Sequence, residues 1–191
     1  MSKYKPGEAL PLEEGLYTHI NPIIGPFLHE KLGLSPNGVT TISLFVAFYI
    51  AYSIYAGNYK IAAALVLLRQ VLDSTDGYIA RRYGISSEFG AKYDVMVDYI
   101  HIFLMRSMIL YKLRGNVPIF VTLIILKLYM DIEIGDRIKC LKRTGVCKDE
   151  KIRHEILKHT RRFSPFEYTL LEALFVFNMK YFIEKIIHMI I

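Results

Sequence analysis

The chain consists of long apolar blocks separated by short charged segments. Residues 39–57 contain no charged side chain, and at about 1.5 Å per helical residue they nearly cross a bilayer core of about 30 Å. Further apolar blocks occupy residues 61–72, 95–113, 117–130 and 165–191. A helix of a soluble bundle needs a polar stripe, and the first block has none. The pattern predicts an all-α fold, a polytopic transmembrane helical bundle.

The pattern predicts five or six spans. Four helices are expected at residues 39–57, 59–82, 88–113 and 117–139, and a fifth begins after Pro165. The residues that remain are enough for one full span of about 20 residues and little more. Either one long helix ends the chain, or the segment Asn-Met-Lys at residues 178–180 breaks it before a short sixth helix.

A polar leader precedes the bundle, and the whole chain, residues 1–191, is expected to be one domain. Residues 1–38 form the cytoplasmic or interfacial leader, and residues 39–191 form the transmembrane bundle. Within the leader, an amphipathic stretch is interrupted by Pro22 and Pro26. Prolines inside such a stretch favour a short amphipathic helix that lies on the membrane surface rather than spanning it.

Basic residues are concentrated in one segment. The formal net charge is +6, and residues 139–162 contain nine Lys or Arg against three acidic residues. Such a block marks a cytoplasmic loop, and Arg81, Arg82 and Lys92 mark another around residues 83–87. We therefore expect a multi-pass membrane protein whose N-terminus and basic loops face the cytoplasm. Nucleic-acid binding is the competing use of a basic block, but the position between apolar segments argues against it.

Four acidic residues recur at helical spacing on two neighbouring helices. Asp73 and Asp76 share one face of the second predicted helix, and Asp94 and Asp98 share one face of the third. If these faces pack together in antiparallel helices, the four carboxylates converge near the cytoplasmic surface. They cannot all stay ionised in a poorly hydrated cleft without a counter-charge. An all-carboxylate set selects a hard divalent cation, Mg²⁺ or Mn²⁺.

The residues beside the carboxylates indicate a phosphate ligand. Gly77 and Gly90 remove side chains where a helix or a ligand must approach closely. Arg81 lies one turn from Gly77 and can bind a phosphate with its forked guanidinium. Together with divalent cations, these groups are suited to a diphosphate substrate. Arg69, one turn deeper than Asp73, is interpreted as a structural counter-charge rather than a substrate ligand.

The spacing of these residues resembles the signature of the CDP-alcohol phosphotransferase (CDP-alcohol phosphatidyltransferase) family, D-x-x-D-G-x-x-A-R-x8-G-x3-D-x3-D. All eight fixed positions match, and they are Asp73, Asp76, Gly77, Ala80, Arg81, Gly90, Asp94 and Asp98. Upstream, Pro36, Asn37 and Thr40 look like the P-N-x-x-T that opens the first span in this family. The resemblance covers residues 30–100.

The resemblance implies roles for individual residues. Asp73, Asp76 and Asp94 correspond to metal ligands for two ions, and Asp98 corresponds to both a ligand and the general base that activates the acceptor hydroxyl. The implied pocket for the CDP-alcohol is lined by Asn37, Gly38, Val39, Thr40, Gly77, Arg81, Ser87 and Gly90. Independently of the resemblance, three basic residues of the cytoplasmic side could bind an anionic acceptor or simply follow the positive-inside pattern: Arg137, Lys139 and Arg161.

The implied reaction is a phospholipid-synthesis step. A phosphatidyl group moves from CDP-diacylglycerol to the hydroxyl of a small polar alcohol, and CMP is released. Inositol, inositol phosphate, glycerol phosphate and serine all stay open as acceptors. A sibling reaction, transfer from a CDP-aminoalcohol to diacylglycerol, and an intramembrane prenyltransferase are the alternatives. Members of the family are commonly homodimers, and the expected partners are the CDP-lipid, the alcohol and membrane lipid, with no nucleic acid.

Overall fold

The computed structural model describes residues 14–112, 165–181 and 183–184. The regular elements of these residues are all helices, which agrees with the predicted fold class. They are η1 (Leu16–Ile20), α2 (Asn21–Pro26), η2 (Phe27–Lys31), α3 (Pro36–Tyr55), α4 (Tyr59–Arg82), α5 (Glu88–Lys112) and α8 (Pro165–Phe177). The helix predicted at residues 117–139 lies outside the described residues.

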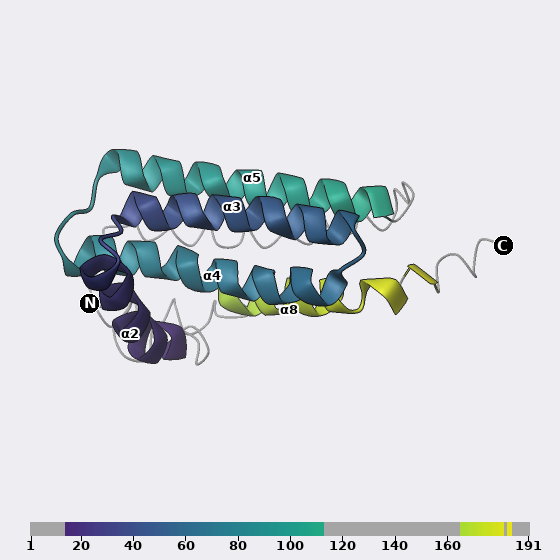
Figure 1. Cartoon of the computed structure of the whole chain (residues 1–191), viewed down its shortest axis with the longest axis horizontal. Coiled ribbons are helices and arrows are strands. Elements are labelled where there is room, and N and C mark those ends of the chain that lie inside the picture. Colours follow the sequence, from purple (N-terminus) through teal and green to yellow (C-terminus); the bar gives the residue numbers. More distant parts are fainter. Residues whose placement is uncertain (1–13, 113–164, 182, 185–191) are drawn as a thin grey trace, which may run out of the picture.

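Helices α3, α4 and α5 lie side by side and alternate in direction (Figure 1). Short connections join them, and each connection contains a glycine with a left-handed backbone, Gly57 at φ 80° and Gly84 at φ 67°. Such a backbone is easily adopted only by glycine. Helix α3 begins at Pro36, earlier than the predicted residue 39, because Ser35 caps it: its Oγ accepts a hydrogen bond from the Gly38 amide at 3.1 Å.

The apolar core lies in the half of the bundle that contains the N-terminal part of α4. Ala62, Ala63 and Val66 of α4 pack there with the end of α5 and with α8, and Figure 1 shows α8 running along this half of α4. The small alanine side chains allow the helices to approach closely. This packing holds α4 and α5 together at one end, so that their charged halves are positioned at the other end.

The predicted N-terminal amphipathic helix is present as one continuous stretch through η1, α2 and η2. It lies at an angle to the bundle beside the C-terminal half of α4 (Figure 1). Pro22 and Pro26 do not break it; π-helical turns flank α2, and one is closed by the Leu32 amide bonding to the Phe27 carbonyl at 3.3 Å. Its outer side exposes Ile23 at 74% and Phe27 at 55%, as an interfacial helix requires.

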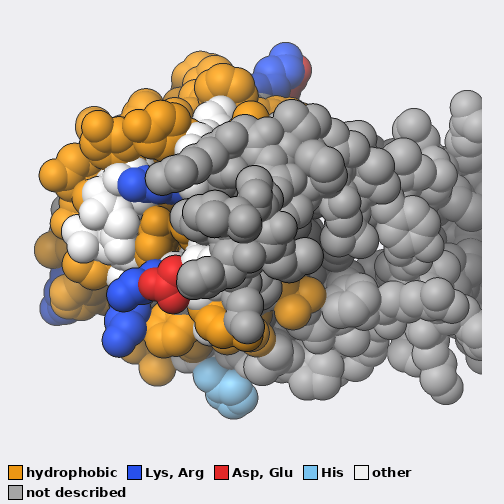
Figure 2. Space-filling view, turned by 90° about the vertical axis from the view of Figure 1, so that its right-hand side faces the viewer, with side chains coloured by type: hydrophobic (Ala, Val, Ile, Leu, Met, Phe, Trp, Pro, Cys, Tyr) orange, Lys and Arg blue, Asp and Glu red, His pale blue; other side chains and the backbone are white. Residues whose placement is uncertain are grey.

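The outer surface of the described bundle is strongly apolar. Large side chains such as Phe45, Tyr99 and Phe103 are 67–70% exposed. Figure 2 views the end of the bundle away from the α4–α5 connection, where hydrophobic side chains make up most of the visible described surface. Among the described helices, α3 alone is long and apolar enough to cross a membrane by length and composition. An apolar surface of this kind suits contact with lipid.

Near the C-terminus, α8 ends at Phe177 and Asn178 forms a turn. This is the position at which the sequence allowed a break in the last apolar block. The number of spans stays a prediction, since residues 113–164 lie outside the described part of the chain.

Candidate active site

Helix α4 has two polar faces on opposite sides. Asp73 and Asp76 lie on the face toward α3 and α5, where Asp76 Oδ2 accepts a hydrogen bond from Thr40 Oγ1 at 2.6 Å. Ser74 and Thr75 lie on the opposite face, against the N-terminal helix. With 3.6 residues per turn, residues three apart such as Asp73 and Asp76 share one face of the helix, and the two residues between them lie on the other face. The predicted acidic stripe of α4 therefore faces the interior of the bundle.

Three of the four predicted carboxylates form a compact cluster. Asp73 of α4 and Asp94 and Asp98 of α5 each offer a carboxylate oxygen, and these atoms all lie within 4.8 Å of one another. The short α4–α5 connection makes the two helices antiparallel, which brings residues far from the turn on each helix opposite each other. The predicted convergence is confirmed for these three residues. Asp76 lies nearer the connection and borders the same cavity as Asp94.

The cluster fits a hard divalent cation. Its donors are all carboxylate oxygens, the ligand type that Mg²⁺ and Mn²⁺ prefer over softer metals. The Asp73 side chain is only 24% exposed and the Asp98 side chain 43%, so neighbouring negative charges are poorly screened by solvent. A divalent ion bound by these carboxylates would offset that repulsion, with the predicted residues as its ligands.

A cavity of about 200 Å³ opens beside the cluster, between the ends of α3, α4 and α5. Six of the eight residues predicted for the CDP-alcohol pocket line it, and so do two of the four aspartates. The six pocket residues are Asn37, Thr40, Gly77, Arg81, Ser87 and Gly90, and the two aspartates are Asp76 and Asp94. The cavity thus joins the carboxylates to the residues expected to bind a nucleotide diphosphate.

Polar side chains of the cavity wall lie close to the two predicted glycines. A Cβ atom on Gly90 would lie 2.9 Å from Asn37 Oδ1 and 3.0 Å from Ser87 Oγ, and a Cβ on Gly77 would lie 3.0 Å from Arg81 Nη1. Ser87 Oγ also accepts a hydrogen bond from the Gly90 amide at 3.0 Å and so caps the start of α5. Any larger residue at position 90 must therefore displace polar groups of the cavity wall.

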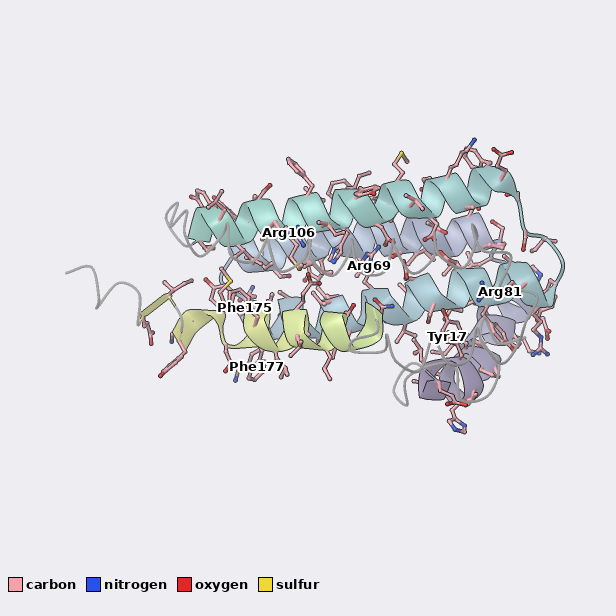
Figure 3. All side chains as sticks on the ribbon, turned by 180° about the vertical axis from the view of Figure 1, so that it is seen from behind. Tyr17, Arg69, Arg81, Arg106, Phe175 and Phe177 are labelled. Carbon is pink, nitrogen blue, oxygen red and sulfur yellow. The ribbon has the colours of Figure 1, made fainter. Side chains whose placement is uncertain are left out.

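Arg81 presents unused hydrogen-bond donors at the cavity. Its Nε and Nη2 atoms are buried and have no hydrogen-bond partner among the described residues, and Figure 3 shows the residue near the α4–α5 connection. Buried donors without a partner are rare in folded proteins. A phosphate oxygen would satisfy both, since a guanidinium donates two parallel hydrogen bonds to such a group.

Two predicted pocket residues do not lie at the cavity, which corrects that part of the prediction. Val39 is fully buried and packs with Leu72 and Ile79 of α4. Gly38 gives its amide to the Ser35 cap. On the first turn of α3 these positions point away from the face that carries Asn37 and Thr40. They are also the two variable positions of P-N-x-x-T, a signal that could have excluded them.

Arg69 lies where a counter-charge was expected. Its Nη2 bonds to Asp98 Oδ1 and lies 3.6 Å from Asp73 Oδ1. The residues proposed to bind the acceptor, Arg137, Lys139 and Arg161, lie outside the described residues.

One contact was not predicted from the sequence: Asn21 binds the face of α4 opposite the acidic residues. Asn21 of α2 is fully buried; its Nδ2 donates to the Ser74 carbonyl at 3.2 Å, and its Oδ1 accepts from Ser74 Oγ and Thr75 Oγ1, both at 3.1 Å. Ser74 and Thr75 stand between the two aspartates of α4. Two hydroxyl residues opposite an acidic stripe were the available signal that a polar partner packs on that side.

Residues 33–152 match the CDP-alcohol phosphatidyltransferase family. This stretch is more than half of the chain and contains the four aspartates of the site and the residues that line the cavity. The chain belongs to this family.

Named relatives are similar to part of the chain. The inner membrane protein YnjF of Escherichia coli is 30% identical over 88 residues, 43% of this chain and 42% of that protein. Archaetidylinositol phosphate synthase of Pyrococcus horikoshii is 32% identical over 98 residues, which are 51% of this chain and 47% of that protein. CDP-diacylglycerol–glycerol-3-phosphate 3-phosphatidyltransferase of Rickettsia felis is 34% identical over 80 residues, which are 40% of this chain and 44% of that protein. The chain spans less than half the length of these relatives. The family and these relatives together indicate that the chain is a membrane protein.

Proposed function

We propose that this chain is a phosphatidyltransferase that moves the phosphatidyl group of CDP-diacylglycerol to the hydroxyl of a small polar alcohol and releases CMP. The observation that carries the proposal is the cluster of Asp73, Asp94 and Asp98 beside a cavity lined by Arg81. Few reactions need clustered carboxylates and a free arginine at one membrane-embedded site. Transfer from a lipid-linked diphosphate can use both, because the carboxylates can hold divalent ions and the arginine can bind a phosphate.

In the proposed reaction, the acceptor oxygen forms a bond to the phosphorus atom distal to cytidine, and the bond between that phosphorus and the CMP oxygen breaks. Asp98 takes the hydroxyl proton. Its Oδ1 is engaged by Arg69, so we assign Oδ2 as the proton acceptor. Arg81 binds the phosphate that leaves with cytidine.

Asp73, Asp76, Asp94 and Asp98 are the residues that would hold the divalent ions, two in the proposal. When bound, such ions neutralise the diphosphate and the charge that develops on the departing CMP. The hydrogen bond from Thr40 orients Asp76 toward the cavity, and this positions one carboxylate at the nucleotide side of the site.

The acceptor is proposed to be a small alcohol, with inositol phosphate and glycerol 3-phosphate tested first because the names of two relatives contain them. Serine and inositol are the further candidates. We also propose a multi-pass arrangement with the cavity at the cytoplasmic face, since Arg81, Arg82 and Lys92 surround the α4–α5 connection. A homodimer is proposed from the family resemblance.

The function is tested with the purified full chain in detergent or nanodiscs. CDP-diacylglycerol is supplied with each acceptor in turn, and CMP release is measured. We expect release that depends on one acceptor. CMP formed only from CDP-choline or CDP-ethanolamine with diacylglycerol would assign the sibling reaction instead, and a folded protein that releases none with any pair contradicts the proposal.

Matched variants make the assay specific to the site. Asp73→Asn removes a carboxylate of the cluster and is expected to abolish CMP release. Glu88→Gln makes the same chemical change on α5 at a side chain that is 84% exposed and paired with Lys92. This control is expected to keep wild-type activity.

A further inference from the structure

Arg69 is a buried cation in the middle of the helical bundle. It is 5% exposed and lies between α4 and α5, well away from the α4–α5 connection (Figure 3). An ionised group at this depth is costly in a membrane protein and is retained when it serves the site around it. The signature that identifies the family does not include this position.

Arg69 is bound to the carboxylates themselves. Its Nη2 contacts Asp98 on α5 and lies near Asp73, one turn along its own helix. Both partners belong to the three-residue cluster whose oxygens lie within 4.8 Å of one another. The guanidinium therefore lies against two of the three carboxylates that would hold a divalent ion.

The surroundings do not satisfy Arg69 as they would a purely structural arginine. Its Nε atom is buried and has no hydrogen-bond partner among the described residues. Buried ion pairs contribute little to stability unless their remaining donors are also bonded. An arginine placed for folding alone is expected to have its other donors paired.

Two consequences follow from the position of Arg69. Its positive charge reduces the attraction of the cluster for any cation, because like charges at close range repel strongly where solvent is scarce. Its bond to Asp98 Oδ1 fixes the orientation of that carboxylate and leaves Oδ2 as the oxygen for the acceptor proton. The first effect weakens metal binding, and the second favours the transfer step.

We propose that Arg69 is a positioning residue that orients Asp98 for proton transfer and limits how tightly the carboxylate cluster binds divalent cations. The inference rests on the proposed function, because it assigns Arg69 to the same site. A counter-charge needed only for folding makes a different prediction. Its loss would disorder the carboxylates, and cation binding would then weaken or stay the same.

The test is direct Mn²⁺ binding by the full chain in detergent, measured by the loss of the free Mn²⁺ signal in electron paramagnetic resonance. Arg69→Met is expected to bind Mn²⁺ tighter than wild type by about tenfold or more, and to lose most of its turnover with little change in KM for CDP-diacylglycerol. Arg82→Met removes the same charge from an exposed position of α4, and its Mn²⁺ affinity is expected to stay at the wild-type value.

Two further variants make the result decisive. Arg69→Gln removes the charge but keeps polar volume, and it replaces Arg69→Met if that protein does not fold. Arg69→Lys restores the charge and is expected to return Mn²⁺ affinity to the wild-type value with part of the turnover. Unchanged or weaker Mn²⁺ binding in a folded Arg69→Met or Arg69→Gln protein overturns the inference. Failure of the wild-type protein to bind Mn²⁺ counts instead against the proposed metal-dependent function.

Discussion

The acidic residues of the site share one chemical group but have different neighbours. Asp76 accepts a hydrogen bond from Thr40, and Asp98 is bound by Arg69. Asp73 lies 3.6 Å from the same arginine and within 4.8 Å of the carboxylates of α5. Because the carboxylates differ in their surroundings, the same substitution is expected to have different effects at each position.

Asp98→Asn and Asp73→Asn are expected to separate the base from a metal ligand. A general base typically contributes 10²–10⁴-fold to a rate, roughly the loss expected for Asp98→Asn, while CDP-lipid binding is largely kept. Asp73→Asn should lose both binding and turnover, because Asp73 is the α4 member of the cluster. Nucleotide affinity and single-turnover rates decide between them. Equal loss of CDP-lipid binding in both variants contradicts the assignment of Asp98 as the base.

Gly90→Ala is expected to raise KM for the CDP-lipid by about tenfold, a cost of roughly 1.4 kcal/mol. The added Cβ meets Asn37 Oδ1 at 2.9 Å and Ser87 Oγ at 3.0 Å, so both cavity side chains must move. Gly15→Ala is the control, since nothing lies within 4 Å of a Cβ there. Steady-state kinetics of the two proteins test this, and equal KM values would show that the cavity wall accommodates the methyl group.

At the level of helices, α4 is held from both sides. Its acidic face packs toward α3 and α5, and its opposite face contacts the N-terminal helix through Asn21, where Gly25 also allows a close approach: a Cβ there would lie 2.7 Å from the Tyr78 ring. A helix fixed on both faces keeps its side chains in one rotational setting. The interfacial helix therefore contributes to the placement of the aspartates without touching the cavity.

Asn21→Ala is expected to destabilise the protein by about 1–3 kcal/mol, because it removes three buried hydrogen bonds between α2 and α4. Ser74 Oγ and Thr75 Oγ1 each keep a bond to the Val71 carbonyl, which limits the loss. Thermal unfolding in detergent measures the change. Thr18→Ala, on the exposed side of the same helix, is the control, and an Asn21→Ala protein as stable as that control would show that this contact does not hold the helix.

At the scale of the whole molecule, charge and apolar surface are separated along the bundle. The apolar core of α4, α5 and α8 lies at one end, and the carboxylates, Arg81 and the cavity lie toward the α4–α5 connection. Charged groups are rare in the apolar part of a membrane protein and mark its functional site, and this separation follows that rule.

Removal of divalent cations is expected to abolish CMP release by the intact protein. The cluster holds several carboxylates and one arginine, so an added cation is needed to bind an anionic diphosphate beside them. Treatment with EDTA followed by addition of Mg²⁺ or Mn²⁺ tests this, with recovery expected for either ion. Undiminished CMP release after thorough chelation would contradict the two-ion proposal.

The helical class, the bounds of α4 and α5 to within a residue, and the convergence of Asp73, Asp94 and Asp98 were predictable from the amino-acid sequence. These features follow from local rules: apolar blocks set helix length, and spacings of three and four residues set which side chains share a face. The short turn around Gly84 then forces two adjacent helices to be antiparallel, so that a local pattern predicts a tertiary contact.

The contacts between distant segments could not be predicted in this way and were visible only in the folded structure. Asn21 contacts the face of α4 opposite the aspartates, and Val39 lies in the core instead of at the cavity. Arg69 of α4 is bound to Asp98 of α5. Each of these depends on how one helix is rotated and tilted against another. Helical periodicity fixes the faces of a single helix, but the packing of many side chains together decides which faces meet.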